Sequence, residues 1–183
     1  MPQEETTDKS TDAAPIELRQ ARVPDAASIW RLVRDSGVLD CNSSYLYLLL
    51  CRDFSDTCVV AERGEETVGF VTAYRLPRDP SVLFVWQIGV CSTARRQGLA
   101  KRMLRDLLDR QDVEQPPRFL EATVAASNIA SRRLFQSLAA DIGATLVEEE
   151  GFLVSDFPAA VSDDPAEAHE AEPRLRIGPL PSA

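Results

Sequence analysis

The residues best suited to chemistry form the segment Arg95-Arg96-Gln97-Gly98-Leu99-Ala100, which lies between an apolar run and an amphipathic one. The pattern predicts that a helix begins near Gln97 or Gly98. A helix start presents unpaired N–H groups and the positive end of the helix dipole, which together bind phosphate. Gly98 and the small Ala100 would let a pyrophosphate approach the backbone closely. Taken alone, the pattern also fits a helix start whose arginines are simply solvated.

Glu121 is the second candidate, because it is a carboxylate inside the otherwise apolar run RFLEATV. Burial strengthens a carboxylate as a base, and a base positioned beside a reacting amine can remove its proton. The alternative is a glutamate at a strand edge that faces solvent or pairs with an arginine.

Several other kinds of site are not expected. The only histidine is His169, so neither Ser/His or Cys/His catalysis nor a histidine-centred metal site has a plausible base or ligand. The four cysteines show no C-x-x-C spacing and are expected to be reduced structural thiols; they are Cys41, Cys51, Cys58 and Cys91.

Charge and hydropathy narrow the partners further. The formal net charge of -9 is concentrated in the two ends of the chain, and no basic face for nucleic acid is expected. No stretch approaches the roughly 18 uncharged apolar residues of a membrane span, and the polar, acidic start is unlike a secretory signal. We therefore expect a soluble, cytoplasmic protein with no membrane or nucleic-acid partner.

These residues must be positioned by the helices and strands of a single domain. We predict that this domain spans residues 16–157, between disordered tails at 1–15 and 158–183.

The helices and strands of this domain follow from local signals. A helix is expected from Pro24 to Ser36, ended by Gly37. A second helix is expected to be capped by Asn42 or Ser43 and to carry Tyr45, Leu48 and Leu49. Strands are expected at 16–21, 57–63, 67–75, 81–90 and 118–124, with further helices from 97 and over 127–140, and a closing hairpin over 144–157. The run 81–90 is apolar on both faces, so it should lie centrally. This order predicts an α+β fold, a mixed, mostly antiparallel sheet flanked by helices in three layers.

Three of these segments together resemble the GNAT acetyltransferase superfamily. The segment 95–100 is similar to its acetyl-CoA pyrophosphate loop, the run 84–90 to its central strand, and the run from Asn128 to Phe135 to its asparagine-led helix beside the CoA arm. The resemblance implies a GNAT fold and acetyl-CoA as co-substrate, with no metal. It also implies a set of cofactor-binding residues: Ile88, Val90, Arg95, Arg96, Gln97, Gly98, Leu99, Ala100, Asn128 and Ser131.

Within that superfamily, the runs 39–54, 83–87 and 120–124 look like the diaminobutyrate acetyltransferases of ectoine biosynthesis. The resemblance implies transfer of acetyl to the 4-amino group of L-2,4-diaminobutyrate, in a homodimer. It places the acceptor pocket at Asp40 and Tyr45. We therefore predict that Glu121 and Tyr45 are catalytic, and that the substrate is bound by Asp40, Asn42, Tyr45, Trp86 and Glu121.

Each of these side chains also has an ordinary structural explanation. Asp40 would attract an ammonium group but could instead cap the helix that follows. Tyr45 could orient the substrate or pack with its hydroxyl at the rim. Trp86 could make a cation–π contact with the amine or fill the core.

One position departs from the superfamily, because Phe135 stands where many members carry a tyrosine that can protonate the departing thiolate. Tyr45, Tyr47, another donor or water would then serve, or the thiolate would need little help. With no histidine partner for any cysteine, direct attack of the amine is expected. Two other functions remain open: acetylation of another small amine or a protein lysine, and a non-catalytic CoA-binding regulatory domain.

Overall fold

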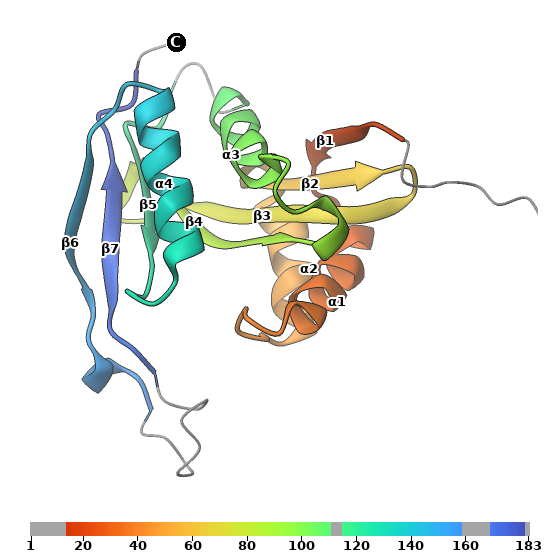
Figure 1. Ribbon diagram of the computed structural model, residues 1–183, viewed down its shortest axis with the longest axis horizontal. Coiled ribbons are helices and arrows are strands. Elements are labelled where there is room, and N and C mark those ends of the chain that lie inside the picture. The colour runs from red at the N-terminus through yellow and green to blue at the C-terminus, as the bar shows by residue number, and fades with distance from the viewer. Residues whose placement is uncertain (1–13, 111–114, 159–168, 182–183) are drawn as a thin grey trace, which may run out of the picture.

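The computed structural model describes residues 14–110, 115–158 and 169–181 of the 183-residue chain. They form a seven-stranded sheet with helices on both faces (Figure 1). The strands are β1 (Ile16–Gln20), β2 (Cys58–Arg63), β3 (Glu66–Leu76), β4 (Asp79–Val90), β5 (Phe119–Thr123), β6 (Leu146–Phe152) and β7 (Glu172–Ile177). The longer helices are α1 (Ala26–Ser36), α2 (Ser44–Asp53), α3 (Leu99–Asp109) and α4 (Ile129–Asp141). Single turns of 3-10 helix, η2 (Val23–Asp25), η3 (Ser55–Thr57), η4 (Ser92–Ala94) and η5 (Val154–Asp156), lie between them.

The sheet order is β1-β2-β3-β4-β5-β7-β6, with β4 in the middle. Neighbouring strands pair antiparallel except β4 and β5, which are parallel. The predicted α+β fold and the central place of the run 81–90 are therefore confirmed.

Two apolar cores lie on opposite faces of this sheet. One packs α3 and α4 against strands that include β3, β4, β5 and β7. The other packs α1 and α2 against β2 and β3. On the α1/α2 face, β5, β7 and β6 therefore extend beyond the helices, and polar side chains can occupy that part of the sheet.

The helix boundaries follow the sequence signals. Gly37 ends α1 in the left-handed conformation, with φ of 66°, which a residue without Cβ adopts at little cost. Ser43 caps α2, since its side chain accepts from the Tyr45 N–H. Helix α2 carries Tyr45, Leu48 and Leu49 as predicted, and its buried side consists of Tyr47, Leu50 and Cys51, whereas Tyr45 and Leu48 are exposed.

The C-terminal part of the chain departs most from expectation. The tail predicted to be disordered over 158–183 contains β7, which lies between β5 and β6. The predicted hairpin over 144–157 is also wrong, since β6 pairs with β7. Apolar and charged side chains alternate along β7. Leu175 and Ile177 therefore pack under α4, while Arg174 and Arg176 point to the other face, and the burial of the apolar pair stabilises the strand. The predicted N-terminal tail lies, up to residue 13, outside the described residues.

Among the described residues, we find no helix with the length and apolar character that crossing a membrane requires.

Candidate active site

The central feature of the site is the divergence of β4 from β5. The two strands pair only from Val82 with Phe119 to Phe84 with Glu121. Strand β4 then continues to Val90 along β3, while β5 ends at Thr123 and pairs with β7. Along this second half of β4, the backbone edge that faces away from β3 pairs with no other strand among the described residues, so it can bind an extended ligand arm. Ile88 and Val90, predicted to bind the cofactor through their backbone, lie on this stretch.

A β-bulge lies where the two strands separate. Thr72 pairs with Gln87, but the next residue, Ala73, pairs with Val85, so Trp86 is the extra residue. A bulge redirects side chains and breaks regular pairing, and bulges are common beside active sites. Trp86 is 45% exposed, so it is not core filler and can contact a ligand.

The segment between α1 and α2 is tied to this part of β4. Gln87 Nε2 donates to the carbonyl of Asp40 at 2.9 Å, and the buried Tyr47 donates from Oη to Gln87 Oε1 at 2.9 Å. Asn42 donates to the same Asp40 carbonyl at 3.3 Å. The structure thereby brings the predicted substrate residues Asp40 and Asn42 to the strand that carries Trp86. Asp40 does not cap α2, and its side chain is exposed.

Tyr45, at the start of α2, is 62% exposed. Its hydroxyl is thus accessible to a ligand, and its proposed role in catalysis stays a prediction. The neighbouring Tyr47 was not predicted as a site residue beyond its mention as a proton donor. Burial raises the pKa of Tyr47, so its hydroxyl stays protonated and available as a donor.

The predicted phosphate-binding turn connects β4 to α3. Arg96 and Gly98 both adopt the left-handed conformation, with φ of 63° and 70°. The Arg95 side chain donates to the Val90 carbonyl at 3.1 Å, and the Gln97 amide to the Thr93 carbonyl at 3.2 Å. Within the described part of the chain, the N–H groups of residues 96–100 have no hydrogen-bond partner. The turn therefore presents the unpaired donors that an anion requires.

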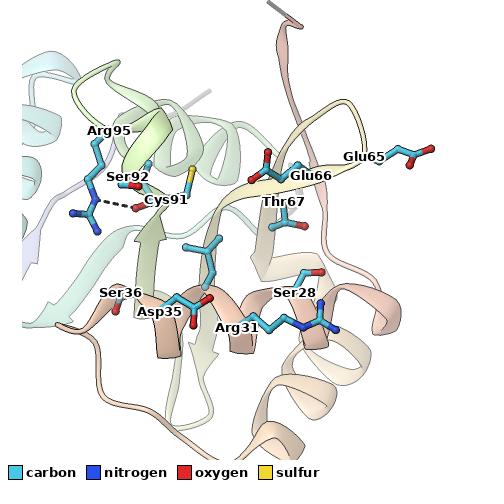
Figure 2. Close-up of a pocket in the computed structure, with 12 residues that line it drawn as sticks. Ser28, Arg31, Asp35, Ser36, Glu65, Glu66, Thr67, Cys91, Ser92 and Arg95 are labelled. Carbon is cyan, nitrogen blue, oxygen red and sulfur yellow. Dashed lines mark hydrogen bonds between the residues drawn. The ribbon is translucent and has the colours of Figure 1, made fainter. Parts of the chain in front are cut away.

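A cavity of about 400 Å³ adjoins this turn on the side of α1. Figure 2 shows Arg95 and Ser92 on one wall, Arg31 and Asp35 from α1 below, and the β2–β3 turn opposite. That turn contributes Glu65 and Glu66, whose charges oppose a polyphosphate. The N–H groups of the turn, and not this cavity, are the candidate phosphate site.

The start of α4 supplies the last of the predicted cofactor residues. Asn128 caps this helix, accepting from the Ser131 N–H at 3.0 Å through its side-chain oxygen. This contact is a structural role that the sequence prediction did not assign to Asn128. Both residues lie at the N-terminal end of α4, the helix that follows β5 along the chain.

Glu121 is buried, 1% exposed, on the face opposite α3 and α4. Its Oε1 accepts from Arg176, and its Oε2 lies 4.0 Å from Arg174 Nη1. Arg176 also stacks over the Phe119 ring at 3.8 Å from the centroid. The carboxylate thus already holds a guanidinium, which is the structural alternative foreseen for it. Whether it also accepts a proton from substrate stays a prediction.

A second carboxylate on this face was missed because it lies in the supposed tail. Glu172 begins β7 and shares a face with Arg174 and Arg176, since side chains alternate along a strand. Its Oε2 accepts from the Thr123 hydroxyl at 2.7 Å. Among the described residues, no arginine or lysine lies within ion-pair distance of it. Thr123 ends β5, so Glu172 lies beside the opening between β4 and β5.

Four of the groups considered for proton donation or covalent catalysis are instead packed against other parts of the structure: Phe135, Cys51, Cys58 and His169. Phe135 is 3% exposed and packs in the core between the sheet and α3 and α4. Burial raises the pKa of the Cys51 thiol to about 11 and that of Cys58 to about 12, so neither is a thiolate at neutral pH. His169 stacks on the Phe157 ring at a centroid distance of 4.6 Å.

Comparison with known proteins gives three consistent findings. The model of the acetyltransferase (GNAT) family matches residues 24–139. L-2,4-diaminobutyric acid acetyltransferase of Streptomyces coelicolor is 45% identical over 91% of this chain and 95% of its own. Its counterpart in Halalkalibacterium halodurans is 45% identical over 90% of this chain and 82% of its own.

A solved structure extends the likeness to three dimensions. It is that of diaminobutyrate acetyltransferase EctA from Paenibacillus lautus in complex with L-2,4-diaminobutyric acid and coenzyme A. The TM-score is 0.83 at 42% identity, over 91% of this chain and 96% of that one.

Proposed function

Because this chain belongs to the GNAT acetyltransferase family, and within it to the L-2,4-diaminobutyric acid acetyltransferases, we propose that it acetylates L-2,4-diaminobutyrate. Acetyl passes from acetyl-CoA to the 4-amino group, giving N4-acetyl-L-2,4-diaminobutyrate and CoA. The observation that carries this conclusion is the likeness to the P. lautus enzyme, which was solved with both diaminobutyrate and coenzyme A.

The chain has a fitting place for acetyl-CoA. The unpaired N–H groups of residues 96–100 would hold the pyrophosphate, with the arginines of the turn beside it. The free edge of β4, at Ile88 and Val90, would pair with the pantetheine arm. A backbone N–H of the same edge would polarise the thioester carbonyl.

The acceptor amine must lose a proton before it can attack, because an alkyl ammonium has no lone pair. Glu121 was the predicted acceptor, but it is already bound by Arg176. Glu172 shares its face of the sheet and is bonded there to a neutral hydroxyl. We therefore propose that Glu172 accepts the proton, and that Glu121 holds the Arg176 side chain in place on the same face of the sheet.

Attack is direct: the amine adds to the thioester carbonyl to form the C–N bond, and the C–S bond then breaks to release CoA. Two observations support this route: burial keeps the thiols of Cys51 and Cys58 protonated, and the ring of His169 is engaged with Phe157. The departing CoA sulfur is a tolerable leaving group, since thiols have a pKa of about 8.5. Tyr45, which is exposed near the start of α2, is proposed as its proton donor.

The cellular compartment and the oligomeric state are part of the same proposal. The described cysteines are all free thiols, which supports a reducing compartment such as the cytoplasm. The homodimer implied by the family resemblance is supported by the exposed apolar side chains Phe152, Leu153 and Val154 at the sheet edge. Light scattering on the purified protein would give its oligomeric state.

The test of function is a panel of amines with acetyl-CoA, following thiol release. Diaminobutyrate should be used far better than ornithine, putrescine or a lysine peptide. A preference for any of those would support the broader alternative of another amine substrate. Tight acetyl-CoA binding without thiol release for any amine would instead indicate a regulatory domain.

A further inference from the structure

The segment from Gly37 to Ser43, here called the acceptor loop, is held by hydrogen bonds to the carbonyls of Asp40 and Asn42. Gln87 and Asn42 both donate to the Asp40 carbonyl, at 2.9 and 3.3 Å. Trp30 of α1 donates to the carbonyl of Asn42 at 3.3 Å. The contact from Gln87 is the long-range one, since 47 residues separate it from Asp40.

Gln87 can reach this loop because of the bulge at Trp86. Val85 faces the core under α3 and α4, and strict alternation would give Gln87 that same face. The extra residue reverses the alternation, so Gln87 pairs opposite Thr72 and meets Tyr47 on the α1/α2 face. One irregularity thus exposes Trp86 and directs its neighbour toward the acceptor loop.

Tyr47 fixes the orientation of the Gln87 amide. Its hydroxyl donates to Oε1 at 2.9 Å, which leaves Nε2 as the group that faces the Asp40 carbonyl. Tyr47 itself is 0% exposed, and a buried ring has few alternative positions. A rigid α2 side chain therefore determines where the acceptor loop meets β4.

We propose that Gln87 and Tyr47 are positioning residues that set the spacing between Asp40 and Trp86, and with it the selectivity for a four-carbon diamine. This inference rests on the proposed function. One wall of the acceptor site is Trp86, adjacent to Gln87 in the chain, and the other carries Asp40, whose carbonyl Gln87 holds. A change in this tether alters the room for the substrate chain without touching the phosphate-binding turn.

The test uses Tyr47→Phe, which removes one hydroxyl, and Gln87→Met, which keeps the length but removes both bonds. Tyr74→Phe is the matched control for the first, since within the described residues the Tyr74 hydroxyl makes no hydrogen bond. Gln136→Met, at an exposed position of α4, is the control for the second. Each variant is assayed for kcat, for the KM of both substrates, for Tm, and for diaminobutyrate against ornithine and 2,3-diaminopropionate.

We expect Tyr47→Phe to raise the KM for diaminobutyrate about three- to tenfold, the usual effect of one neutral hydrogen bond. Gln87→Met should raise it further, and both should narrow the preference over ornithine, with the KM for acetyl-CoA within twofold of wild type. Unchanged selectivity, or parallel losses in all parameters together with Tm, would overturn the positioning role alone. A wild-type protein that does not acetylate diaminobutyrate would overturn the proposed function as well.

Discussion

Replacing Glu121 and Glu172 separately by glutamine should have opposite consequences for stability and activity. The two carboxylates share one face of the sheet and differ in their partners. Glu121 is buried and bound by Arg176, whereas Glu172 accepts from the Thr123 hydroxyl. Glu121→Gln should therefore lower stability, because it breaks the ion pair. Glu172→Gln should lower turnover, because it removes the proton acceptor.

The cost of Glu121→Gln can be estimated from its surroundings. Removing one partner of a fully buried ion pair costs about 3–5 kcal/mol. The Arg176 side chain is 25% exposed, and the new amide oxygen can still accept from it, so we expect about 2 kcal/mol. For a chain of this size that corresponds to a Tm decrease of about 4–8 °C. The turnover of the folded variant should stay within a few-fold of wild type.

Glu172→Gln should change Tm by less than about 2 °C, since an amide oxygen can still accept from Thr123. Loss of a general base lowers kcat by about 10²- to 10⁴-fold. Glu149→Gln is the matched control, because it removes a carboxylate from a partly exposed pair with Arg174, worth less than about 1 kcal/mol.

The assay combines thermal unfolding with thiol release at saturating acetyl-CoA. A double variant, Glu121→Gln with Arg176→Gln, should recover part of the lost stability, because no guanidinium is then left without its partner. Loss of turnover in Glu121→Gln at unchanged Tm would contradict this assignment, since Glu121 would then be the proton acceptor as first predicted. A fully active Glu172→Gln variant would contradict it equally.

Three further predictions address the cofactor turn, the core and the thiols. Gly98→Ala should raise the KM for acetyl-CoA about tenfold and cost about 1–2 kcal/mol, because φ of 70° strains a residue with Cβ; an unchanged KM would remove this turn from cofactor binding. Phe135→Tyr should lower Tm, since a hydroxyl would enter an apolar core, but turnover should stay within a few-fold; a larger change would place the position in the chemistry. The raised pKa values of Cys51 and Cys58 mean that their contribution to stability is complete below pH 9 and is lost as pH rises toward 11 to 12. Urea unfolding of the Cys51→Ala/Cys58→Ala variant should therefore depend less on pH in this range, while activity persists; an inactive single variant would contradict direct attack.

The sequence predicted the elements whose signals are local. Apolar periodicity located α1, α3 and the central strand, and Gly37 and Gly98 marked helix ends, because these patterns depend on neighbours within one turn or strand. The turn at residues 95–100 was predicted as a phosphate site from its own residues, and the resemblance to diaminobutyrate acetyltransferases predicted the acceptor loop.

The parts that escaped prediction depend on distant partners. Strand β7 is short and follows an acidic, proline-containing segment, and its burial comes from α4 and β5. The pairing of Glu121 with Arg176 joins residues 55 apart. The bulge at Trp86 is defined by its register with β3, which no pattern within β4 reveals. These three features decide which carboxylate is bound by an arginine and where the acceptor loop lies.

The most direct measurement of the central claim is the structure of the product formed from acetyl-CoA and L-2,4-diaminobutyrate, assigned by NMR. The account predicts a single product with acetyl on the 4-amino nitrogen and one CoA released per acetyl transferred. Acetyl on the 2-amino nitrogen, or no product while another amine is acetylated, would contradict it.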